Sequence, residues 1–561
     1  MNGVYETFAR GLSLTQFPAI EQGRRLHSCG AEIAGPYRTP SAGDQHSLAA
    51  QVTHDYLQYE RYPDALSKNI YLTALHDRNE VLFYRLLSEN LREMIPIVDD
   101  FTVGMAMAQY HHECRPPQGV CLSINHAGEI QEAFSNFGMC PNDVDLILAT
   151  DAEQVLGVGD WGVGGVEVAI SKLAIYTAAG GIDPTRVIPV ILDVGTNRES
   201  LLKDPTHIGN WHARIRGQQY DDVVDEYVNV ATRLCSNALL QWNDFAPENG
   251  RRILEQYRDR IGTFNDDIQR TGAITLAAVI SAVRACGTTL RNHRVVIFGA
   301  GTAGIGITDR IRNAMVREGL SKSEAAKRFW CVDRQGLLTA DMLGEQRIYQ
   351  VSYARPTDDN GDWQHGEGGG DLSVAEVAGR VKPTMLIGVS TASGSFTEAI
   401  IRDMAAHTDR PIVFSLSNPP VRAEAKPSDL IAWTDGRALI ATGSPSAPVT
   451  HKGVTHVVAE LNNSMLYPGL GLGVVVSKAC RVSEGMLFAA ASAVSSLVTV
   501  RQPGASLLPS IDNLRSVLAT VAVAVAEAAD AEGLARVRLD DVVQQVQDAM
   551  WQPEYRHAVA V

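Results

Sequence analysis

A glycine-rich turn between an apolar strand and a helix constrains this chain more than any other feature. The segment VVIFGAGTAGIGI contains Gly299-x-Gly301-x-x-Gly304, with an apolar strand before the first glycine and a helix after the last. The first glycine permits a tight turn, the second lets the backbone approach a pyrophosphate, and the third allows close helix–strand packing. The pyrophosphate then sits at the helix N-terminus. The segment predicts a dinucleotide-binding (Rossmann) unit, in which Thr302 and Ala303 also contact the dinucleotide. A structural turn without nucleotide is the alternative.

An acidic residue is expected at the end of the second strand of such a unit, where it binds the ribose hydroxyls. Phe329–Val332 is typical of that strand, and it is followed by Asp333, somewhat farther downstream than the usual ~20 residues. The Asp333 carboxylate would repel a 2′-phosphate and so favours NAD. The adjacent Arg334 could offset this repulsion and admit NADP.

Strand and helix patterns alternate in two regions of the chain, which implies parallel sheets. In the first region, buried strands are expected at Asp145–Thr150 and Val187–Leu192, with a helix at Val166–Ala179 between them. In the second region we expect strands at Arg294–Phe298, Met385–Val389 and Pro411–Leu416, and a helix at Thr308–Glu318. The predicted fold class is α/β, with a helical N-terminal region, a central α/β catalytic domain and a Rossmann-type NAD-binding domain.

A chain of 561 residues is too long for one core, so two to four domains are expected. Residues 1–60 are polar and turn-rich and resemble a loosely packed arm, whereas residues 68–109 have helical periodicity. Residues 360–370 have the composition of a mobile loop, and residues 514–550 are typical of a helical tail. The predicted domains are an arm and helical region at 1–130, a catalytic domain at 131–272 completed by part of 455–530, the NAD-binding domain at 273–454, and a tail at 531–561.

Charge and composition exclude several classes of partner. The net charge is −15, so binding to nucleic acid or anionic lipid would need a basic patch that the sequence does not contain. No apolar run is long enough to span a membrane, and the first residues do not resemble a signal peptide. The eight cysteines are scattered without a Cys-x-x-Cys, which favours a reducing cytoplasm. The adjacent residues His111–Cys114 cannot all face one ion on a helix, so a structural role is the expectation.

Carboxylates in separate polar segments form a candidate metal site. Residues 262–272 read GTFNDDIQRTG and contain Asp266 and Asp267, and further upstream lie Asn243-Asp244 and Asp160. Such oxygen ligands suit Mg²⁺ or Mn²⁺. Taken alone, paired aspartates more often cap helices or lie in solvated turns.

Taken together, these segments resemble the malic enzyme family, which oxidatively decarboxylates L-malate to pyruvate and CO₂. The resemblance runs from about residue 66 to residue 555 and includes TDAEQVLGVGDWGVGG, SKLAIYTAAGGIDP, TFNDDIQ, FGAGTAGIGI, SLSNPP and NNSMLYPGLGLG. The GDWGV segment also resembles the malolactic branch, which converts malate to lactate and retains its nicotinamide cofactor.

The resemblance implies roles for individual residues. Lys172 matches the general base that accepts the C2 hydroxyl proton, and the alternative is a lysine on the surface of a helix. Asp266 is also expected to be a catalytic residue. Asp244 and Asp267 match two of three ligands of a metal that polarises the C2 oxygen and stabilises the enolate. The resemblance also implies residues that contact the nicotinamide side of the cofactor and the carboxylate of the substrate. These residues are Ser390, Asn418, Asn462 and Asn463.

Four positions depart from the family pattern. Asp99 stands where the tyrosine that protonates the enolate is expected, and an aspartate could act as this acid only if burial raised its pKa well above ~3.9. Asn243 replaces a carboxylate metal ligand by an amide whose carbonyl can still coordinate. Arg270 places a cation beside the metal loop, and Gln154 replaces a substrate-binding arginine.

These departures leave several interpretations open. The site acts on a malate-like substrate with altered efficiency, or on another β-carboxy or phosphono 2-hydroxy acid that Arg270 clamps in a bidentate fork, or it has little catalysis. By class, the alternatives are a metal-dependent decarboxylating oxidoreductase, a redox-neutral malolactic-type enzyme with tightly held NAD, and a non-catalytic NAD-binding regulator. A homodimer or homotetramer is expected by analogy with the family.

Overall fold

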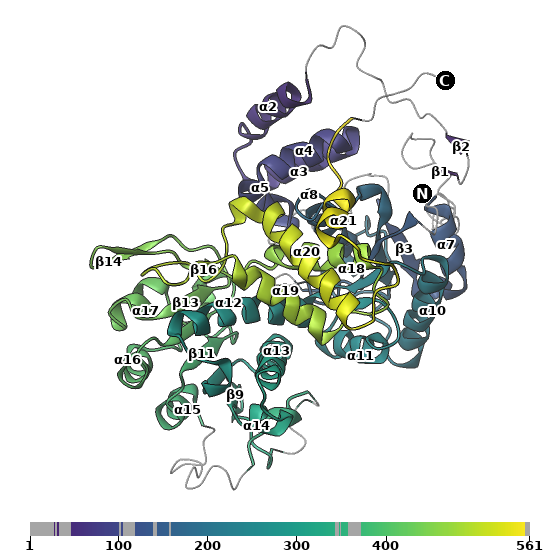
Figure 1. Ribbon diagram of the computed structural model, residues 1–561. Coiled ribbons are helices and arrows are strands. Elements are labelled where there is room, and N and C mark those ends of the chain that lie inside the picture. The colour runs from purple at the N-terminus through teal and green to yellow at the C-terminus, as the bar shows by residue number, and fades with distance from the viewer. Residues whose placement is uncertain are drawn as a thin grey trace. The chain divides into compact units, whose positions relative to one another are not determined.

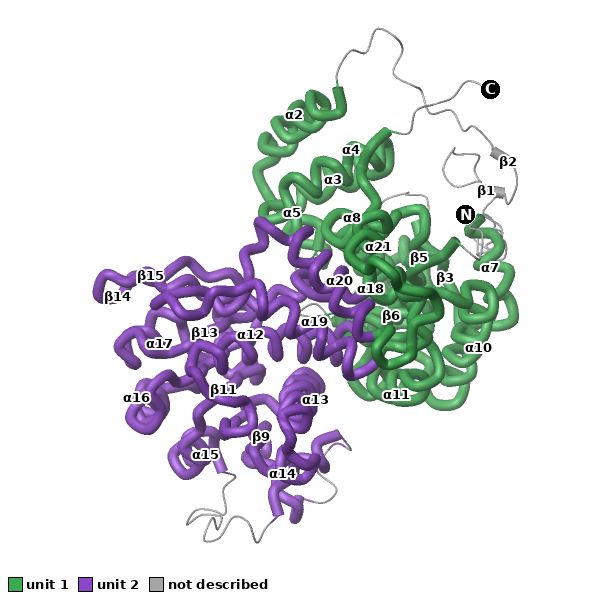
Figure 2. Tube along the Cα trace, in the orientation of Figure 1, with its two compact units in different colours: residues 1–265, 471–482, 529–561 green, residues 266–470, 483–528 purple. Residues whose placement is uncertain are grey.

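The structure, a computed structural model, describes residues 47–99, 102–104, 118–138, 143–155, 159–342, 347, 349–356 and 372–555, and the short paired strands β1 (His27–Ser28) and β2 (Ala31–Glu32). The chain divides into two compact units (Figure 2). Unit 1 comprises Met1–Asn265, Gly471–Val482 and Ala529–Val561, and unit 2 comprises Asp266–Leu470 and Ser483–Ala528. The predicted division into four domains uses other boundaries and stays a prediction. The predicted loop at 360–370 lies outside the described residues.

In the described part of the chain, four helices follow β1 and β2 in unit 1 (Figure 1): α2 (Leu48–Tyr59), α3 (Ala65–Arg78), α4 (Glu80–Glu89) and α5 (Leu91–Val98). The side chains of Ser47, Asp64 and Asn79 cap the first three, each accepting a backbone N–H that the helix leaves free. Helices α3 to α5 confirm the predicted helical periodicity from residue 68 to residue 98, and residues 105–109 of that prediction lie outside the described residues. Helix α2 corrects the prediction of an arm extending to residue 60, because this polar segment buries Val52 and Tyr59 on one face.

The core of unit 1 is a five-stranded parallel sheet with the order β3-β5-β4-β6-β7. Its strands are β3 (Val120–Ser123), β4 (Leu146–Thr150), β5 (Val187–Asp193), β6 (Leu239–Trp242) and β7 (Thr263–Asn265). The accompanying helices are α7 (Ile130–Asn136), α8 (Val166–Ala178), α9 (Glu199–Leu202), α10 (Gln218–Leu234) and α11 (Pro247–Tyr257). Every residue of β4 and β5 is buried, as expected of parallel strands covered on both faces. Strand β4, helix α8 and strand β5 confirm the predicted strand–helix–strand unit.

Unit 2 contains a seven-stranded sheet with the order β10-β9-β8-β11-β12-β13-β16, parallel throughout except for the β9–β10 pair. Its strands are β8 (Val295–Phe298), β9 (Phe329–Asp333), β10 (Gly336–Leu337), β11 (Met385–Gly388), β12 (Ile412–Ser415), β13 (Leu439–Thr442) and β16 (Ala459–Glu460). From β8 the chain goes to β9 on one side and then to β11 on the other. The strand order therefore reverses between β8 and β11, and such a switch point is where open α/β sheets bind ligands.

The helices assigned to unit 2 are α12 (Thr271–Cys286), α13 (Thr302–Arg317), α14 (Lys322–Ala326), α15 (Val374–Val381), α16 (Glu398–His407), α17 (Pro427–Trp433) and α19 (Glu484–Ser496). A hairpin pairs β14 (Val449–His451) with β15 (Val454–His456). Helix α13 begins directly after the second glycine of the loop, earlier than the predicted start at Thr308. The early start places the helix N-terminus against the glycine turn.

The C-terminal region also corrects a prediction. Helices α18 (Tyr467–Ser477) and α20 (Leu514–Ala531) begin in unit 2 and end in unit 1, and α21 (Val542–Ala549) belongs to unit 1. The predicted continuous helical tail is interrupted after α20, where Gly533 adopts a left-handed φ of 68° that ends the helix. None of the helices within the described ranges is long and apolar enough to cross a membrane.

Candidate active site

The glycine loop after β8 has the geometry that a dinucleotide requires. Gly299 has a φ of 99°, and an added Cβ would lie 2.6 Å from the Val389 carbonyl group. A Cβ on Gly304 would lie 2.0 Å from the Gly299 oxygen, so this glycine allows α13 to approach the turn. At Gly301, by contrast, a Cβ would meet no described atom within 4 Å. That open space lies at the helix N-terminus, where a pyrophosphate would approach the backbone.

The first turn of α13 supplies a further unsatisfied polar atom. Thr302 Oγ1 is buried and hydrogen-bonds to none of the described residues. A buried polar atom without a partner is costly, so it fits a ligand phosphate that would satisfy it. Ala303 follows it in the same turn. The loop residues predicted to hold the cofactor therefore come together in the structure.

Asp333 ends β9 as predicted, and the structure shows what orients its carboxylate. Oδ1 accepts the backbone N–H of Arg334 at 3.0 Å, and Oδ2 accepts Gln350 Nε2 at 2.9 Å. Gln350 is 1% exposed and donates also to the Ala300 carbonyl oxygen at 2.8 Å. It thus joins the ribose-binding candidate to the glycine loop. No local motif marked Gln350 in the sequence, because its role arises from contacts across 17 and 50 residues. The Arg334 side chain is exposed.

The other cofactor candidates lie in loops after neighbouring strands. Ser390 follows β11, and its N–H and Oγ both donate to Glu424 Oε1 at 2.8 Å. Asn418 follows β12, where its Nδ2 donates to the Gly443 carbonyl oxygen at 3.1 Å and its Oδ1 accepts from Ser444 Oγ. Both loops follow the carboxyl ends of their strands, at the same edge of the sheet as the glycine loop.

Asn462 and Asn463 have different environments. Asn462 Oδ1 accepts the N–H and the hydroxyl of Ser464 at 3.0 and 2.6 Å, so it caps a short helical turn. Asn463 Oδ1 is buried and has no hydrogen-bond partner among the described residues. Of the two amides, Asn463 is therefore the better candidate for contacting a ligand.

The metal candidates of unit 1 directly follow β6. Asn243 is fully buried, and its Nδ2 donates to Asp244 Oδ2 at 2.6 Å. This bond fixes the amide orientation, and it leaves Asn243 Oδ1 buried without a hydrogen-bond partner in the described part of the chain. Asp244 adopts a left-handed φ of 56° and accepts the Gln154 N–H on its carbonyl oxygen at 3.0 Å. A buried, unsatisfied carbonyl oxygen beside a carboxylate is a donor set that fits Mg²⁺ or Mn²⁺.

Asp267, the third predicted ligand, lies in unit 2 within the π-helix η6 (Asp266–Arg270) that follows β7. Among the described residues, no group of three or more His, Cys, Asp or Glu could hold a metal ion. Of the three predicted ligands, Asn243 and Asp244 thus belong to unit 1 and Asp267 to unit 2, and their joint role stays a prediction.

Asp266 and Arg270 pair with each other within η6. Arg270 Nη2 lies 2.8 Å from Asp266 Oδ2, and the two side chains are 5% and 0% exposed. The Arg270 guanidinium also lies over the Tyr467 ring, 5.2 Å from its centroid. Arg270 therefore already has a carboxylate partner within the protein. Its predicted clamp on a substrate and the catalytic role of Asp266 stay predictions.

Lys172 projects from α8 and is only 7% exposed. This burial excludes the alternative of a surface helix lysine. Asp99 is half-buried at the C-terminal cap of α5, where its N–H donates to the Ile95 carbonyl oxygen at 2.9 Å. Gln154 is exposed in the segment after β4. His111–Cys114 lie outside the described residues.

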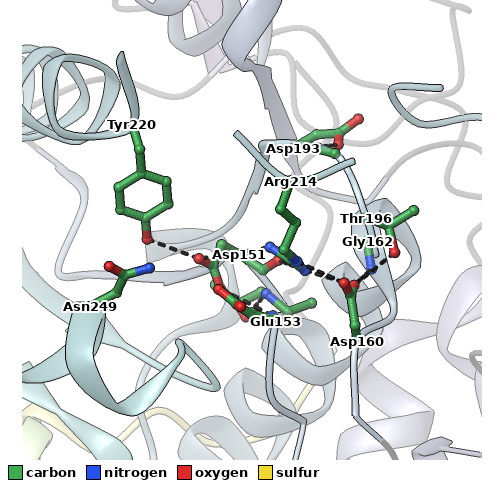
Figure 3. Close-up of polar contacts among 12 residues, drawn as sticks. Asp151, Glu153, Asp160, Gly162, Asp193, Thr196, Arg214, Tyr220 and Asn249 are labelled. Carbon is green, nitrogen blue, oxygen red and sulfur yellow. Dashed lines mark hydrogen bonds and ion pairs between the residues drawn. The ribbon is translucent and has the colours of Figure 1, made fainter. Parts of the chain in front are cut away.

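A buried charged network ties together loops at the carboxyl edge of the unit 1 sheet (Figure 3). The Arg214 side chain is 1% exposed, and its Nε and Nη2 each donate to Asp160 at 2.8 Å. Asp160 also accepts from Thr196 Oγ1 at 2.9 Å and from the N–H groups of Gly162 and Asn197. Both carboxylate oxygens of Asp160 are thus occupied, which corrects its grouping with the metal-binding carboxylates.

Asp151 is the second carboxylate of this network. Its Oδ2 lies 3.8 Å from Arg214 Nη1 and accepts the Tyr220 hydroxyl at 2.8 Å. Burial raises the pKa of Asp151 to about 6, and the charge of Arg214 offsets part of that effect. At Asp160 burial also opposes ionisation, but the hydrogen bonds and charge of Arg214 hold the pKa of this carboxyl below its usual value. Arg214 therefore lowers the pKa of Asp160, to which it hydrogen-bonds, more than that of Asp151, from which it lies farther away.

Two family models match this chain over most of its length. A family model described as the malic enzyme N-terminal domain matches residues 76–258, and one described as the malic enzyme NAD-binding domain matches residues 268–530. NAD-dependent malic enzyme 3 of Bacillus subtilis is 51% identical over 565 residues, covering 100% of this chain and 98% of that protein. The malolactic enzyme of Lactiplantibacillus plantarum is 42% identical over 513 residues, covering 91% and 92%.

A solved structure supports the fold independently. The crystal structure of Entamoeba histolytica malic enzyme is 21% identical, has a TM-score of 0.56, and covers 90% of this chain and 88% of its own. The predicted fold class and the resemblance noted in the sequence are both confirmed. The chain belongs to the malic enzyme family.

Proposed function

We propose that the protein oxidatively decarboxylates L-malate, or a closely related 2-hydroxy acid, with transfer of a hydride to NAD. The single observation that carries this proposal is the 51% identity to an NAD-dependent malic enzyme over the whole chain. The open space at Gly301 and the oriented carboxylate of Asp333 support NAD as the cofactor. When bound, NAD takes the hydride from C2 of the substrate.

The chain's own residues would bind the substrate and move its protons. Lys172 accepts the C2 hydroxyl proton, and its burial favours exchange of that proton with the substrate rather than with water. The buried Asn463 Oδ1 accepts a hydrogen bond from a ligand hydroxyl or amide. Asp99 is the candidate donor in the final protonation of the enolate.

A divalent cation fits the ligands that the chain offers. Asn243 Oδ1 and the carboxylates of Asp244 and Asp267 would hold Mg²⁺ or Mn²⁺. When bound, the cation polarises the C2 oxygen and stabilises the enolate. The amide at 243 supplies one negative charge fewer than a carboxylate at that position.

The direct test follows NADH and pyruvate together, with purified protein, Mn²⁺, NAD and L-malate. We expect equal amounts of both products, and a fall in kcat of about 100-fold or more in Lys172→Met, because a positioned general base contributes roughly this factor. Isothermal titration with NAD serves as the control, since Lys172→Met should bind NAD as the wild type does. Binding of NAD without turnover of any 2-hydroxy acid would instead identify a non-catalytic regulator.

A second candidate is redox-neutral conversion of malate to lactate. It is favoured by the 42% identity to a malolactic enzyme over most of both chains. In that case lactate forms with no net NADH. Measuring lactate and NADH in one assay separates the two functions. Ordinary turnover of L-malate would also rule out specialisation for another β-carboxy or phosphono 2-hydroxy acid.

We also propose the kind of substrate, the oligomeric state, the location and the partners of the protein. We expect a small-molecule substrate, a homodimer or homotetramer, and a cytoplasmic location without a nucleic-acid or membrane partner. The net charge of −15 supports the absence of a polyanionic partner. Light scattering coupled to size-exclusion chromatography measures the oligomeric state.

A further inference from the structure

Glu424 is a fully buried carboxylate in the segment after β12 of unit 2, and it hydrogen-bonds to the loop after β11. Its Oε1 accepts three hydrogen bonds, from the N–H and Oγ of Ser390 at 2.8 Å each and from Ser417 Oγ at 2.5 Å. Its Oε2 accepts one from Ser415 Oγ at 3.1 Å. Within the described part of the chain no lysine, arginine or histidine forms an ion pair with Glu424. Hydrogen bonds from Ser390, Ser415 and Ser417 therefore satisfy this carboxylate.

The direction of each hydrogen bond follows from the serines' other contacts. Ser390 Oγ accepts the Ala392 N–H at 3.1 Å, and Ser417 Oγ accepts the Thr391 N–H at 2.8 Å. Ser415 Oγ accepts the Ala425 N–H at 3.1 Å. Because each hydroxyl already accepts a backbone N–H, its proton is available to donate to Glu424. The carboxylate and the three hydroxyls thus form one connected network with the backbone of both loops.

The backbone around Glu424 is shaped to admit it. Gly388 ends β11, and an added Cβ there would lie 2.5 Å from Glu424 Cδ and 2.8 Å from Phe396 Cζ. Thr391 has a left-handed φ of 59°, which a non-glycine residue rarely adopts, and the Ser417 hydroxyl holds its N–H. The Glu424 carbonyl oxygen accepts the Phe396 N–H at 3.0 Å. An unfavourable backbone conformation is therefore maintained by a network centred on one side chain.

The loops that Glu424 joins are those after β11 and β12, which carry Ser390 and Asn418. These loops lie at the carboxyl edge of the sheet, beside the switch point between β8 and β11. We propose that Glu424 is a positioning residue that holds both loops in the conformation that binds the nicotinamide half of the cofactor. This inference rests on the proposed function, in which NAD accepts the hydride.

A merely structural role predicts a different result from a positioning role. If Glu424 only stabilised the domain, its loss would lower the melting temperature and leave the folded fraction with normal NAD binding. If it positions the loops, NAD binding and hydride transfer suffer in protein that remains folded. Displacement of reacting groups by about 1 Å can cost on the order of 100-fold in rate.

The test compares Glu424→Ala with Glu424→Gln. The glutamine variant keeps an oxygen where three donors converge and places its amide at the Oε2 position, which among the described residues hydrogen-bonds only to Ser415. We expect Glu424→Gln to retain wild-type values within about threefold. In Glu424→Ala we expect the Kd for NAD to rise about tenfold or more, since several hydrogen bonds that order the site are lost. We also expect kcat to fall by up to about 100-fold at saturating NAD.

Glu318→Ala is the matched control. Glu318 also accepts backbone N–H groups, from Leu290 and Arg291, but it does so before β8, at the opposite edge of the same sheet. The Glu318→Ala variant should have a lower melting temperature than the wild type and an unchanged Kd for NAD. If Glu424→Ala resembles this control, with NAD binding and kcat within twofold of wild type, the proposal is wrong.

Two further measurements keep the test decisive. If Glu424→Ala does not fold, Ser417→Ala removes one Oε1 contact and the acceptor of the Thr391 N–H, and an unchanged Kd for NAD in that variant would overturn the proposal. Isothermal titration with NAD needs no turnover. Wild-type protein that binds NAD but turns over no malate therefore counts against the proposed function, whereas normal NAD binding in the folded variants counts against the role of Glu424.

Discussion

At the scale of single residues, Asn243 shows how one atom can change a site's chemistry while its shape is kept. Its side chain is fully buried and oriented by Asp244, with a carbonyl oxygen that no described residue satisfies. A carboxylate of the same size would add a negative charge at that point. The affinity of a site for a hard cation depends on the number of charged ligands.

We therefore predict that Asn243→Asp raises the affinity for Mn²⁺ by about tenfold, because a charged ligand replaces a neutral one. Without metal the variant should melt at a lower temperature than the wild type, since Asp244 would lose an N–H donor and gain a like charge beside it. Isothermal titration with Mn²⁺ and melting curves with and without EDTA measure both effects. Asn243→Ala, which removes the ligand, should weaken Mn²⁺ binding. Unchanged Mn²⁺ affinity in Asn243→Asp would show that this side chain is not a ligand.

Asp151 predicts a pH dependence of stability. Burial raises its pKa from 3.8 in the unfolded chain to about 6, so the folded protein binds this proton more tightly. The stabilising contribution is therefore fully present below pH ~4 and is lost as the pH rises through ~6. We expect Asp151→Asn to become more stable relative to wild type over that range, by up to about 3 kcal/mol. Melting curves between these pH values test this, and a constant difference would contradict it.

At the scale of elements, the strand ends and the turns that follow them carry the candidate site. Buried parallel strands are short apolar runs, so β4, β5, β8, β9, β11 and β12 could be predicted from local composition. The loops after these strands have no such pattern. Their conformations depend on residues such as Gln350 and Glu424, which are remote in sequence from most of what they contact.

The glycine loop gives a matched pair of variants within this element. Gly301→Ala should leave the melting temperature close to wild type, because its Cβ meets no described atom, but it should raise the Kd for NAD about tenfold by blocking the pyrophosphate. Gly304→Ala should lower both stability and NAD affinity, because its Cβ would lie 2.0 Å from the Gly299 oxygen. Thermal melts and NAD titrations separate these effects. Equal behaviour of the two variants would exclude the proposed division of roles.

At the scale of the whole molecule, the chain crosses between the two units at residues 265/266, 470/471, 482/483 and 528/529. The last segment is hydrogen-bonded to unit 1. The N–H of Trp551 donates to the Gly181 carbonyl oxygen at 2.7 Å. The N–H of Cys480 donates to the Leu534 carbonyl oxygen at 3.0 Å. The C-terminal segment is therefore part of the structure of unit 1.

Removing residues 529–561 should accordingly destabilise unit 1 while unit 2 continues to bind NAD. We expect slow amide hydrogen exchange across β3–β7 in the wild type, faster exchange there in the truncated chain, and an NAD affinity within about threefold of wild type. Hydrogen exchange read by mass spectrometry resolves the two units in one experiment. A truncated chain with wild-type protection throughout β3–β7 would contradict this assignment.

The sequence by itself determined the features that depend on local chemistry. The spacing of Gly299, Gly301 and Gly304 after an apolar strand is enough to predict a dinucleotide turn, because each glycine answers a steric need within one loop. Helical periodicity likewise predicted α3 to α5. Helix α2 was missed, since it is polar and its stability comes from burying Val52 and Tyr59 on one face.

Only the tertiary structure determined which polar groups neutralise one another and which stay available for a ligand. Arg214 forms hydrogen bonds with Asp160, which is 54 residues away in the sequence. By contrast, Asn243 Oδ1 and Asn463 Oδ1 have no hydrogen-bond partner in the described chain. The buried pair of Asp266 and Arg270 likewise emerged only when both side chains were placed. The physical reason is that the cost of burying a polar atom depends on its neighbours in space, and sequence spacing does not specify those neighbours for residues far apart in the chain.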